Sequence, residues 1–503
     1  KYPDKEKVKF LAVGSKVDEW GKMTCKDTKD ILDNPAFNLD FNMYISFHND
    51  LDGKFCEGKE KRNLANPSSH VMSKEEIYDY HPYGVPIVKF DDDGNPKADK
   101  KKNNILVTPP APWEWKNHPK MLKDEIFWGE MVNGVIYYGE QVARRLNAQE
   151  ITFAEKARDT AFAHLKSKYV VEDEEPLKIM GFWKVVDNWE VSDFLILIRC
   201  NDEEELVYVP FRGGVFLKPV TSMRVGSPPL AIVMPFACRV DTLKRFFDTV
   251  AIEFSKVKGA NKKKIIIAWG FCNTDEYEDN KVGGGAIEEI INPFREKMGG
   301  KIPVIIKGTN KRFSRGSTLN LGLSLVNKDD IAVVLDVDMS VQKGYFYRSR
   351  AFARDGQSAY FPITFSNYNP ATLNKGYKDK TKPDDISYRS GRWREFGYGM
   401  LSVNINDFKQ GFDAKNKMWG MEDVQMYDII KKQGIFAYRV HDTSIKHIWH
   451  EKHCGHLKSI DKKRYFMCVG SKLGVEGNWR QQGAQVLELQ DALNGQAKTG
   501  LSG

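Results

Sequence analysis

The chain has 503 residues, enough for two or three domains with a sizeable apolar core. It is 41% hydrophobic and 12% aromatic, and its 76 basic and 68 acidic residues give a net charge of +8. No dense Lys/Arg tract and no apolar run near the roughly 18 residues of a membrane span occurs, which argues against a nucleic-acid-binding protein and a transmembrane segment. The charge suits ordinary solubility as well as an anionic small molecule or an acidic polymer.

Processing signals and cysteines bear on the compartment. The chain begins Lys1-Tyr2-Pro3 without a methionine, so we expect that a signal or anchor has been removed. Seven cysteines are scattered along it, and only Cys454 and Cys468 are close enough to suggest a local disulfide. No Asn-x-Ser/Thr acceptor with a non-proline middle residue occurs, which weighs against a glycosylating lumen.

Residues 1–225 are predicted to be a mixed α+β region whose role the sequence does not reveal. The aspartates of Phe90–Pro96 could mimic a metal site, but the following Gly-Asn-Pro favours a hairpin turn. Apolar spacing predicts helix from 120 to 168, and residues 179–220 are predicted to be β-rich. The helical prediction rests on Ile126, Met131, Val135 and Tyr138, and then on Phe153, Ala157, Ala161 and Leu165.

From residue 228 to 480 strands and helices alternate, after a boundary at Gly226–Pro229. This alternation predicts an α/β domain with a parallel sheet covered on both faces, and ligands in such sheets bind beyond the carboxyl ends of the strands. Residues 481–503 are predicted to be a C-terminal tail. The predicted strands are Leu230–Met234, Lys264–Trp269, Ile302–Ile306 and Ile331–Leu335, and the predicted helices begin near Asp241, Ala286 and Ser317.

Two aspartates, Asp336 and Asp338, directly follow the apolar run Ile331–Leu335. Two carboxylates at a strand tip can share one divalent cation, and their hard oxygen ligands suit Mg²⁺ or Mn²⁺. Aspartates also favour turns, so the pair alone is weak evidence. Its place within the strand–helix alternation favours a metal site that neutralises a diphosphate leaving group.

A second acidic pair, Glu422 and Asp423, opens a helix that is predicted to end at Gly434. A helix dipole alone favours acidic residues in the first turn, but the same dipole keeps an aspartate ionised. An ionised carboxylate within reach of an acceptor hydroxyl is what a single-displacement transfer needs. We therefore expect the pair to supply a general base.

Two histidines, His447 and His450, lie in the His-rich segment Ile445–Cys454. A zinc site would need a matching cysteine pair, which is missing nearby. We expect one of the two to complete the metal shell begun by the aspartates, and a histidine in this set favours Mn²⁺ over Mg²⁺. A purely structural hydrogen-bonding role is the alternative.

Together these residues resemble a known family. Residues 228–475 are similar to the catalytic domain of chondroitin N-acetylgalactosaminyltransferases, which belong to a wider set of inverting, metal-dependent enzymes that includes the β1,4-galactosyltransferases. The runs Ile448–Cys454 and Tyr465–Cys468 are particularly specific to this group. The other matching stretches are Val233–Asp241, Phe313–Gly316, Leu335–Met339, Phe361–Ile363, Phe365–Pro370, Gly411–Asp413 and the segment from Trp419.

The resemblance implies a GT-A-type, Rossmann-like catalytic domain that binds a UDP-sugar and Mn²⁺ or Mg²⁺. The implied nucleotide-sugar contacts come from Pro235, Phe236, Arg239, Arg315, Asp336, Asp338, Trp419 and Gly420. The implied metal ligands are Asp338 and His447, with Asp336 close by and His450 as the alternative histidine. The implied catalytic residues are Asp423 as general base and Glu422 as the group that orients donor or acceptor.

The expected function is an inverting transfer of a sugar, GalNAc first of all, from UDP to a hydroxyl of a chondroitin-like, possibly acidic glycan. Met418 and Met421 replace glycines of the family pattern, so a galactosyl- or glucosyltransferase is kept as an alternative. A non-catalytic partner of another glycosyltransferase is the other alternative, and either a homo- or a hetero-oligomer fits. The family setting is the Golgi lumen, with a cytoplasmic or viral-particle setting left open.

Overall fold

The structure is a computed structural model that describes residues 89–90, 96–97, 111–113, 126–169, 177–186, 193–200, 202–212, 215–216, 220–258, 262–271, 284–408, 411–412, 422–452, 454–455 and 462–484. The chain divides into two compact units. Unit 1 holds the described residues of Ser366–Arg392 and Ile448–Gly503, and unit 2 those of Ser73–Phe365 and Trp393–His447.

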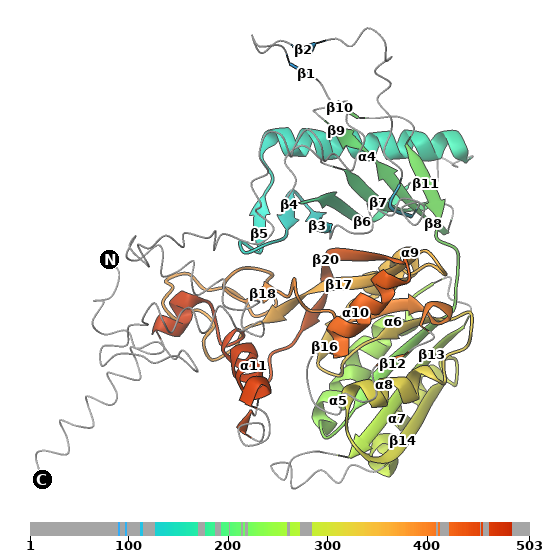
Figure 1. Cartoon of the computed structure of the whole chain (residues 1–503), viewed down its shortest axis with the longest axis vertical. Helices are drawn as coiled ribbons and strands as arrows, with labels where there is room; N and C mark the ends of the chain where they lie inside the picture. Colours follow the sequence, from blue (N-terminus) through green and yellow to red (C-terminus); the bar gives the residue numbers. More distant parts are fainter. Residues whose placement is uncertain are drawn as a thin grey trace, which may run out of the picture. The chain divides into compact units, whose positions relative to one another are not determined.

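Four parallel strands form one end of the unit 2 sheet in the order β15-β12-β13-β14, with β14 at its edge (Figure 1). Successive residues of β12 enter two different apolar cores, with Ile232 and Met234 on one face and Ala231 and Val233 on the other. A strand buried on both faces reads as a continuous apolar run, which is why the sequence predicted it. The strands are β12 (Leu230–Phe236), β13 (Lys263–Phe271), β14 (Val304–Arg312) and β15 (Ile331–Val334).

Helices follow these strands, as the alternation predicted, and the α/β fold class is confirmed. In chain order they are α5 (Val240–Phe246), continued by η3 (Phe247–Ala251) and α6 (Ile252–Ser255), then α7 (Gly284–Met298) and α8 (Arg315–Leu323). The sheet continues beyond β15 with antiparallel β19 (Leu401–Asn404), and then with β17 (Ser358–Asn367) and β20 (Phe436–His447). Short β18 (Gly391–Trp393) pairs with β17.

Strand β20 carries the late histidine to the aspartates. Immediately after Asp338 the chain forms β16 (Met339–Val341), which pairs antiparallel with the end of β20. In this register Met339 lies opposite His447, so Asp338 is a diagonal neighbour of that histidine. Helices α9 (Lys343–Phe352) and α10 (Glu422–Lys432) pack against β20, and α10 opens at the predicted acidic pair.

The earlier part of unit 2 is an antiparallel sheet in the order β11-β8-β7-β6-β3, with α4 packed on β7 and β8 (Figure 1). The prediction of a β-rich segment at 179–220 is therefore confirmed. The elements are β3 (Phe127–Val132), β4 (Val135–Tyr137), β5 (Ala143–Arg145), α4 (Ala148–Lys168), β6 (Lys178–Val185), β7 (Phe194–Cys200), β8 (Glu203–Val209) and β11 (Thr221–Arg224). A short hairpin joins β9 (Phe211–Arg212) and β10 (Val215–Phe216).

The helix predicted over 120–168 is wrong in its first half. Residues 127–145 contain three strands, and of the described residues in this span only 148–168 are helical. Asn133 and Gly134, both at positive φ (50° and 75°), make the turn between β3 and β4. An Asn-Gly pair between two short apolar runs is a strong hairpin signal, and it prevails over apolar spacing that happens to suit a helix. The helix itself starts at a capping box formed by Asn147 and Glu150.

A buried ionic group crosses from β3 to the later strands of unit 2. Arg348 on α9 forms salt bridges with Glu130 of β3 and with Asp442 of β20. Asp442 also accepts a hydrogen bond from the hydroxyl of Tyr360, and Glu130 accepts one of 2.6 Å from the backbone nitrogen of Thr443. Strand β3 itself runs parallel to β20 and pairs with it. The earlier and later regions of unit 2 are thus held together by the pairing of β3 with β20 and by the salt bridges of Arg348.

Other predictions concern short or undescribed segments. The predicted hairpin near Phe90–Pro96 is present, since β1 (Lys89–Phe90) pairs antiparallel with β2 (Pro96–Lys97). In unit 1 the disulfide Cys454–Cys468 is confirmed, and it joins helix α11 (Lys462–Leu473) to the segment before it. Trp419, Gly420, the tail beyond 484 and most of 1–125 lie outside the described residues. None of the helices in the described part is both long and apolar enough to cross a membrane.

Candidate functional site

The carboxyl end of β12 leads into the first of the predicted nucleotide contacts. Pro235 and Phe236 close the strand, and both are buried, with the ring of Phe236 in the apolar core. Three residues later Arg239 precedes α5, and its Nη1 donates a 2.7 Å hydrogen bond to Oδ2 of Asp338. Of this group, then, Arg239 is the side chain that reaches the aspartates, while the expected contacts of Pro235 and Phe236 with a uridine stay predictions.

Arg315 contacts two other predicted site residues, Asp336 and Glu422. It is the first residue of α8, and its Nε donates a 3.0 Å hydrogen bond to Oδ1 of Asp336. Its Nη2 donates to the carbonyl of Gly399 at 2.7 Å, and its Nη1 lies 3.8 Å from Oε1 of Glu422. One guanidinium therefore links the end of β15 to the start of α10. Arg315, Asp336 and Glu422 were each predicted as site residues, and the structure brings them together, while their roles stay predictions.

Burial and opposite charge act against each other at this link. Burial raises the pKa of Glu422, and the charge of Arg315 opposes that shift. Burial raises the pKa of Asp336 too, again against the charge of Arg315. For Arg315 burial works to lower the pKa, but the neighbouring carboxylates prevail and raise it. The guanidinium thus stays charged among acidic groups that are costly to ionise.

Asp423 differs from its neighbour Glu422 in its surroundings. Glu422 is buried, and its Oε2 has no hydrogen-bond partner in the described part of the chain. Asp423 is half-buried, and its Oδ1 accepts a 3.0 Å bond from the backbone nitrogen of Val424 in the first helical turn. Both carboxylates lie in the first turn of α10. The roles expected of Asp423 as general base and of Glu422 as orienting group stay predictions.

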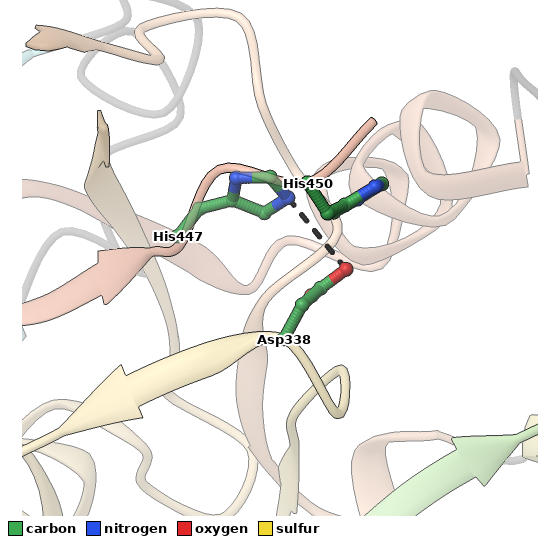
Figure 2. A group of neighbouring side chains, drawn as sticks. All are labelled: Asp338, His447 and His450. Atoms are coloured by element: carbon green, nitrogen blue, oxygen red, sulfur yellow. Dashed lines mark ion pairs between the residues drawn. The ribbon is translucent and has the colours of Figure 1, made fainter. Parts of the chain in front are cut away.

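A candidate metal centre lies around Asp338. The Nε2 of His447 is 3.7 Å from Oδ2 of Asp338, and both residues are buried (Figure 2). Together with His450, each residue offers one ligand atom, and these atoms all lie within 4.8 Å of one another. One carboxylate with imidazole nitrogens is a donor set that fits Mn²⁺. Both histidines predicted as alternatives belong to this group, whereas Asp336 faces Arg315.

Sequence reasoning missed two arginines at this centre. The Nη2 of Arg394 lies 3.4 Å from Nδ1 of His447. Arg245 on α5 donates a 3.3 Å bond to the carbonyl of Val337, between the two aspartates, and burial lowers its pKa. Neither residue belongs to a motif, and both reach the site only through tertiary packing. They add positive charge where an anionic group would bind.

Comparison with known proteins finds one family model and several relatives, and their names agree with one another. Residues 199–481 match the family model described as chondroitin N-acetylgalactosaminyltransferase. Human chondroitin sulfate synthase 3 is 30% identical over 243 residues, which cover 48% of this chain and 26% of that protein. Mouse chondroitin sulfate N-acetylgalactosaminyltransferase 1 is 32% identical over 288 residues, covering 56% of this chain and 51% of that protein.

The chain therefore spans between about a quarter and a half of the length of these relatives. Among solved structures, GalNAc-T7 with UDP, GalNAc and Mn²⁺ overlaps with a TM-score of 0.30 at 13% identity, covering 44% of each chain. The family model alone covers more than half of the 503 residues. The chain belongs to the chondroitin N-acetylgalactosaminyltransferase family.

Proposed function

We propose that this chain is an inverting, metal-dependent glycosyltransferase that moves GalNAc from UDP-GalNAc to a hydroxyl of a chondroitin-like glycan. The observation that carries the proposal is the link made by Arg315 between Asp336 and Glu422. This link joins the end of β15, which is expected to hold the nucleotide, to the start of α10, which bears the candidate base Asp423. Family membership agrees with this chemistry.

In the proposed reaction Asp423 accepts the proton of the acceptor hydroxyl as its oxygen attacks C1 of the donor sugar. The new bond forms on the face opposite the phosphate, the bond from C1 to the phosphate oxygen breaks, and UDP leaves. Arg239 and Arg315 lie where their charges would favour the departing diphosphate. A Mn²⁺ ion held by Asp338 and His447, with His450 within reach, would neutralise that leaving group. Glu422 would orient the sugars.

Turnover of the donor is the test. The full chain should release UDP from UDP-GalNAc in the presence of Mn²⁺ and a glycan acceptor, and a chelator should abolish the release. A screen of UDP-GalNAc, UDP-galactose and UDP-glucose distinguishes the galactosyl- and glucosyltransferase alternatives. A chain that binds UDP but releases it from none of these donors would instead be the non-catalytic partner.

The acceptor is proposed to be acidic, with a uronate at its reacting end. The basic segment 374–394, which lies in unit 1 up to Arg392, supports this class, since Lys378 and Lys380 are exposed at the tip of a loop. The side chain of Asn374 closes that loop with hydrogen bonds of 2.6 and 3.0 Å to the backbone of Thr381. A loop that closes over the sugars would exclude water that otherwise hydrolyses the donor.

Charge reversal at Lys378 and Lys380 should raise the acceptor KM in a salt-sensitive way and leave the donor KM almost unchanged. If only neutral acceptors react and the reversal has no effect, the acidic acceptor is refuted while the transferase proposal stands.

The proposed compartment is the Golgi lumen. The disulfide between Cys454 and Cys468 supports an oxidising environment, because such bonds are rare in the reducing cytosol. The missing Asn-x-Ser/Thr acceptors weigh against this compartment, but a protein of that lumen need not be N-glycosylated. Microscopy of the tagged full-length protein against organelle markers tests this assignment, and a diffuse cytosolic signal would contradict it.

A further inference from the structure

Unit 1 carries two arginines on one tyrosine ring. The guanidinium carbon of Arg389 lies 4.4 Å from the ring centre of Tyr377, and that of Arg480 lies 4.6 Å from it. Tyr388 meets Tyr377 edge-to-face at 6.1 Å, and its own ring is 45% exposed. Trp479, beside Arg480, is 53% exposed. We call these five residues the Tyr377 platform.

Buried polar side chains hold the platform together. Asn478 donates to the hydroxyl of Tyr377 at 3.2 Å and to the carbonyl of Tyr388 at 3.0 Å. Gln481 donates to the carbonyl of Arg389 at 2.8 Å and also accepts from the backbone nitrogen of Asn478. Both anchors are buried, Gln481 completely. Segments about ninety residues apart are thus fixed against each other, so the platform is built in advance of any ligand.

None of the five platform residues carries a negative charge that could neutralise the two arginines. Among the residues that the structure describes, neither Arg389 nor Arg480 forms a salt bridge with a carboxylate. Arg389 donates instead to the backbone carbonyl of Asp379 at 3.1 Å and to the hydroxyl of Tyr388 at 3.4 Å. Two cations held near one ring repel each other, and an anion bound by both would relieve that repulsion. Contact with the ring also restrains the two guanidinium groups, which lowers the entropy lost when they bind.

We propose that the Tyr377 platform binds the uronate carboxylates of an acidic glycan chain, with sugar rings lying on Tyr388 and Trp479. The chemistry favours this ligand because a guanidinium edge matches a planar carboxylate with two parallel hydrogen bonds. Exposed aromatic rings beside the arginines suit the apolar faces of sugars, which a lipid headgroup or a bare phosphate would leave unused. The inference rests on the proposed function, since it names where the acceptor chain is held.

The test measures binding to the full chain by calorimetry, without UDP-sugar or metal. The ligand is a non-sulfated polymer of alternating uronate and N-acetylhexosamine. The double variant Arg389→Gln, Arg480→Gln should bind it at least roughly tenfold more weakly, because a hydrogen bond to a charged group is lost at each position. The double variant Arg389→Lys, Arg480→Lys keeps both positive charges but cannot form the two parallel hydrogen bonds of a guanidinium. It should bind the polymer more tightly than the glutamine variant does but more weakly than wild type.

The matched control removes two other cations of unit 1. Lys462 lies over the ring of Phe466, and Lys472 pairs with Glu451, so Lys462→Gln, Lys472→Gln deletes the same net charge elsewhere. This control should bind within about twofold of wild type. The wild-type chain should bind a carboxyl-reduced form of the polymer at least roughly tenfold more weakly than the native polymer.

The inference is overturned if the glutamine variant binds the polymer as tightly as wild type does. It is overturned too if wild type binds the carboxyl-reduced polymer as tightly as the native polymer, or if an oligonucleotide or anionic vesicles compete as effectively as the native polymer does. UDP release, measured separately, tells the two proposals apart. If release fails with every donor while the platform variant loses glycan binding, only the transferase proposal falls. If release succeeds and the variant binds the glycan normally, only the platform assignment falls.

Discussion

Replacing Asp423 by asparagine separates catalysis from binding at this site. The carboxylate is half-buried, and its Oδ1 accepts a hydrogen bond from the backbone nitrogen of Val424, which an asparagine oxygen can accept equally well. We therefore expect the fold, and the Mn²⁺-dependent binding of UDP, to be retained. Only the proton acceptor is lost. Positioned general bases contribute roughly 10²–10⁴-fold, so kcat should fall by that factor, or about 2.7–5.4 kcal/mol in activation free energy.

The assay is steady-state UDP release at saturating donor and acceptor, with UDP affinity measured by calorimetry on the same preparation. Glu422→Gln is the matched comparison, because its side chain is buried and lies 3.8 Å from Arg315. That variant should alter donor affinity as well as kcat. The reasoning about Asp423 is refuted if its asparagine variant turns over at near the wild-type rate, or if it loses UDP affinity in parallel with kcat.

Three further predictions address the metal centre and the buried ionic group. Asp338→Ala and His447→Ala should both weaken Mn²⁺-dependent UDP binding more than His450→Ala does, and Mn²⁺ titrations showing the opposite order would exchange the roles of the histidines. Arg348→Met leaves two buried carboxylates uncompensated and should cost roughly 3–5 kcal/mol in denaturant unfolding; a loss below 1 kcal/mol would contradict this. Burial raises the pKa of Glu130 above 4.5, so the folded state binds its proton more tightly than the unfolded state. The stability of wild type relative to Glu130→Gln should therefore decline as pH rises from about 4.5 through the raised pKa, and a flat or rising difference would refute the assignment.

The parallel strands of unit 2 could be predicted because the signal for each is local in sequence. Strands β12, β13 and β15 have middle residues that are buried on both faces and appear as apolar runs, and the helices between the strands show a helical period. The segment after Ile126 could not be assigned from spacing alone, because two short strands across a turn reproduce helical intervals. The Asn133-Gly134 pair was the decisive signal, and it was overlooked.

At the site, what could be predicted was the set of residues carried by strand ends and helix starts. Asp336, Asp338 and Glu422 come together in space because each sits at such an end. The partners that fix them could not be predicted in the same way. Arg394 contacts His447 although it lies 53 positions earlier in the chain. A single charged residue outside any periodic pattern gives no sign of such a contact. Pairings of this kind depend on how the sheet and its loops pack.

The pairing of β3 with β20 has a practical consequence for anyone who expresses this protein in parts. A fragment trimmed to the family match at 199–481 would lose β3, β6 and nearly all of β7. Strand β20 would then present an open edge of unpaired backbone groups, and such edges recruit other chains into aggregates. Arg348 would keep Asp442 but lose Glu130. The shortest soluble piece should therefore begin ahead of residue 126, well before the segment by which the family is recognised.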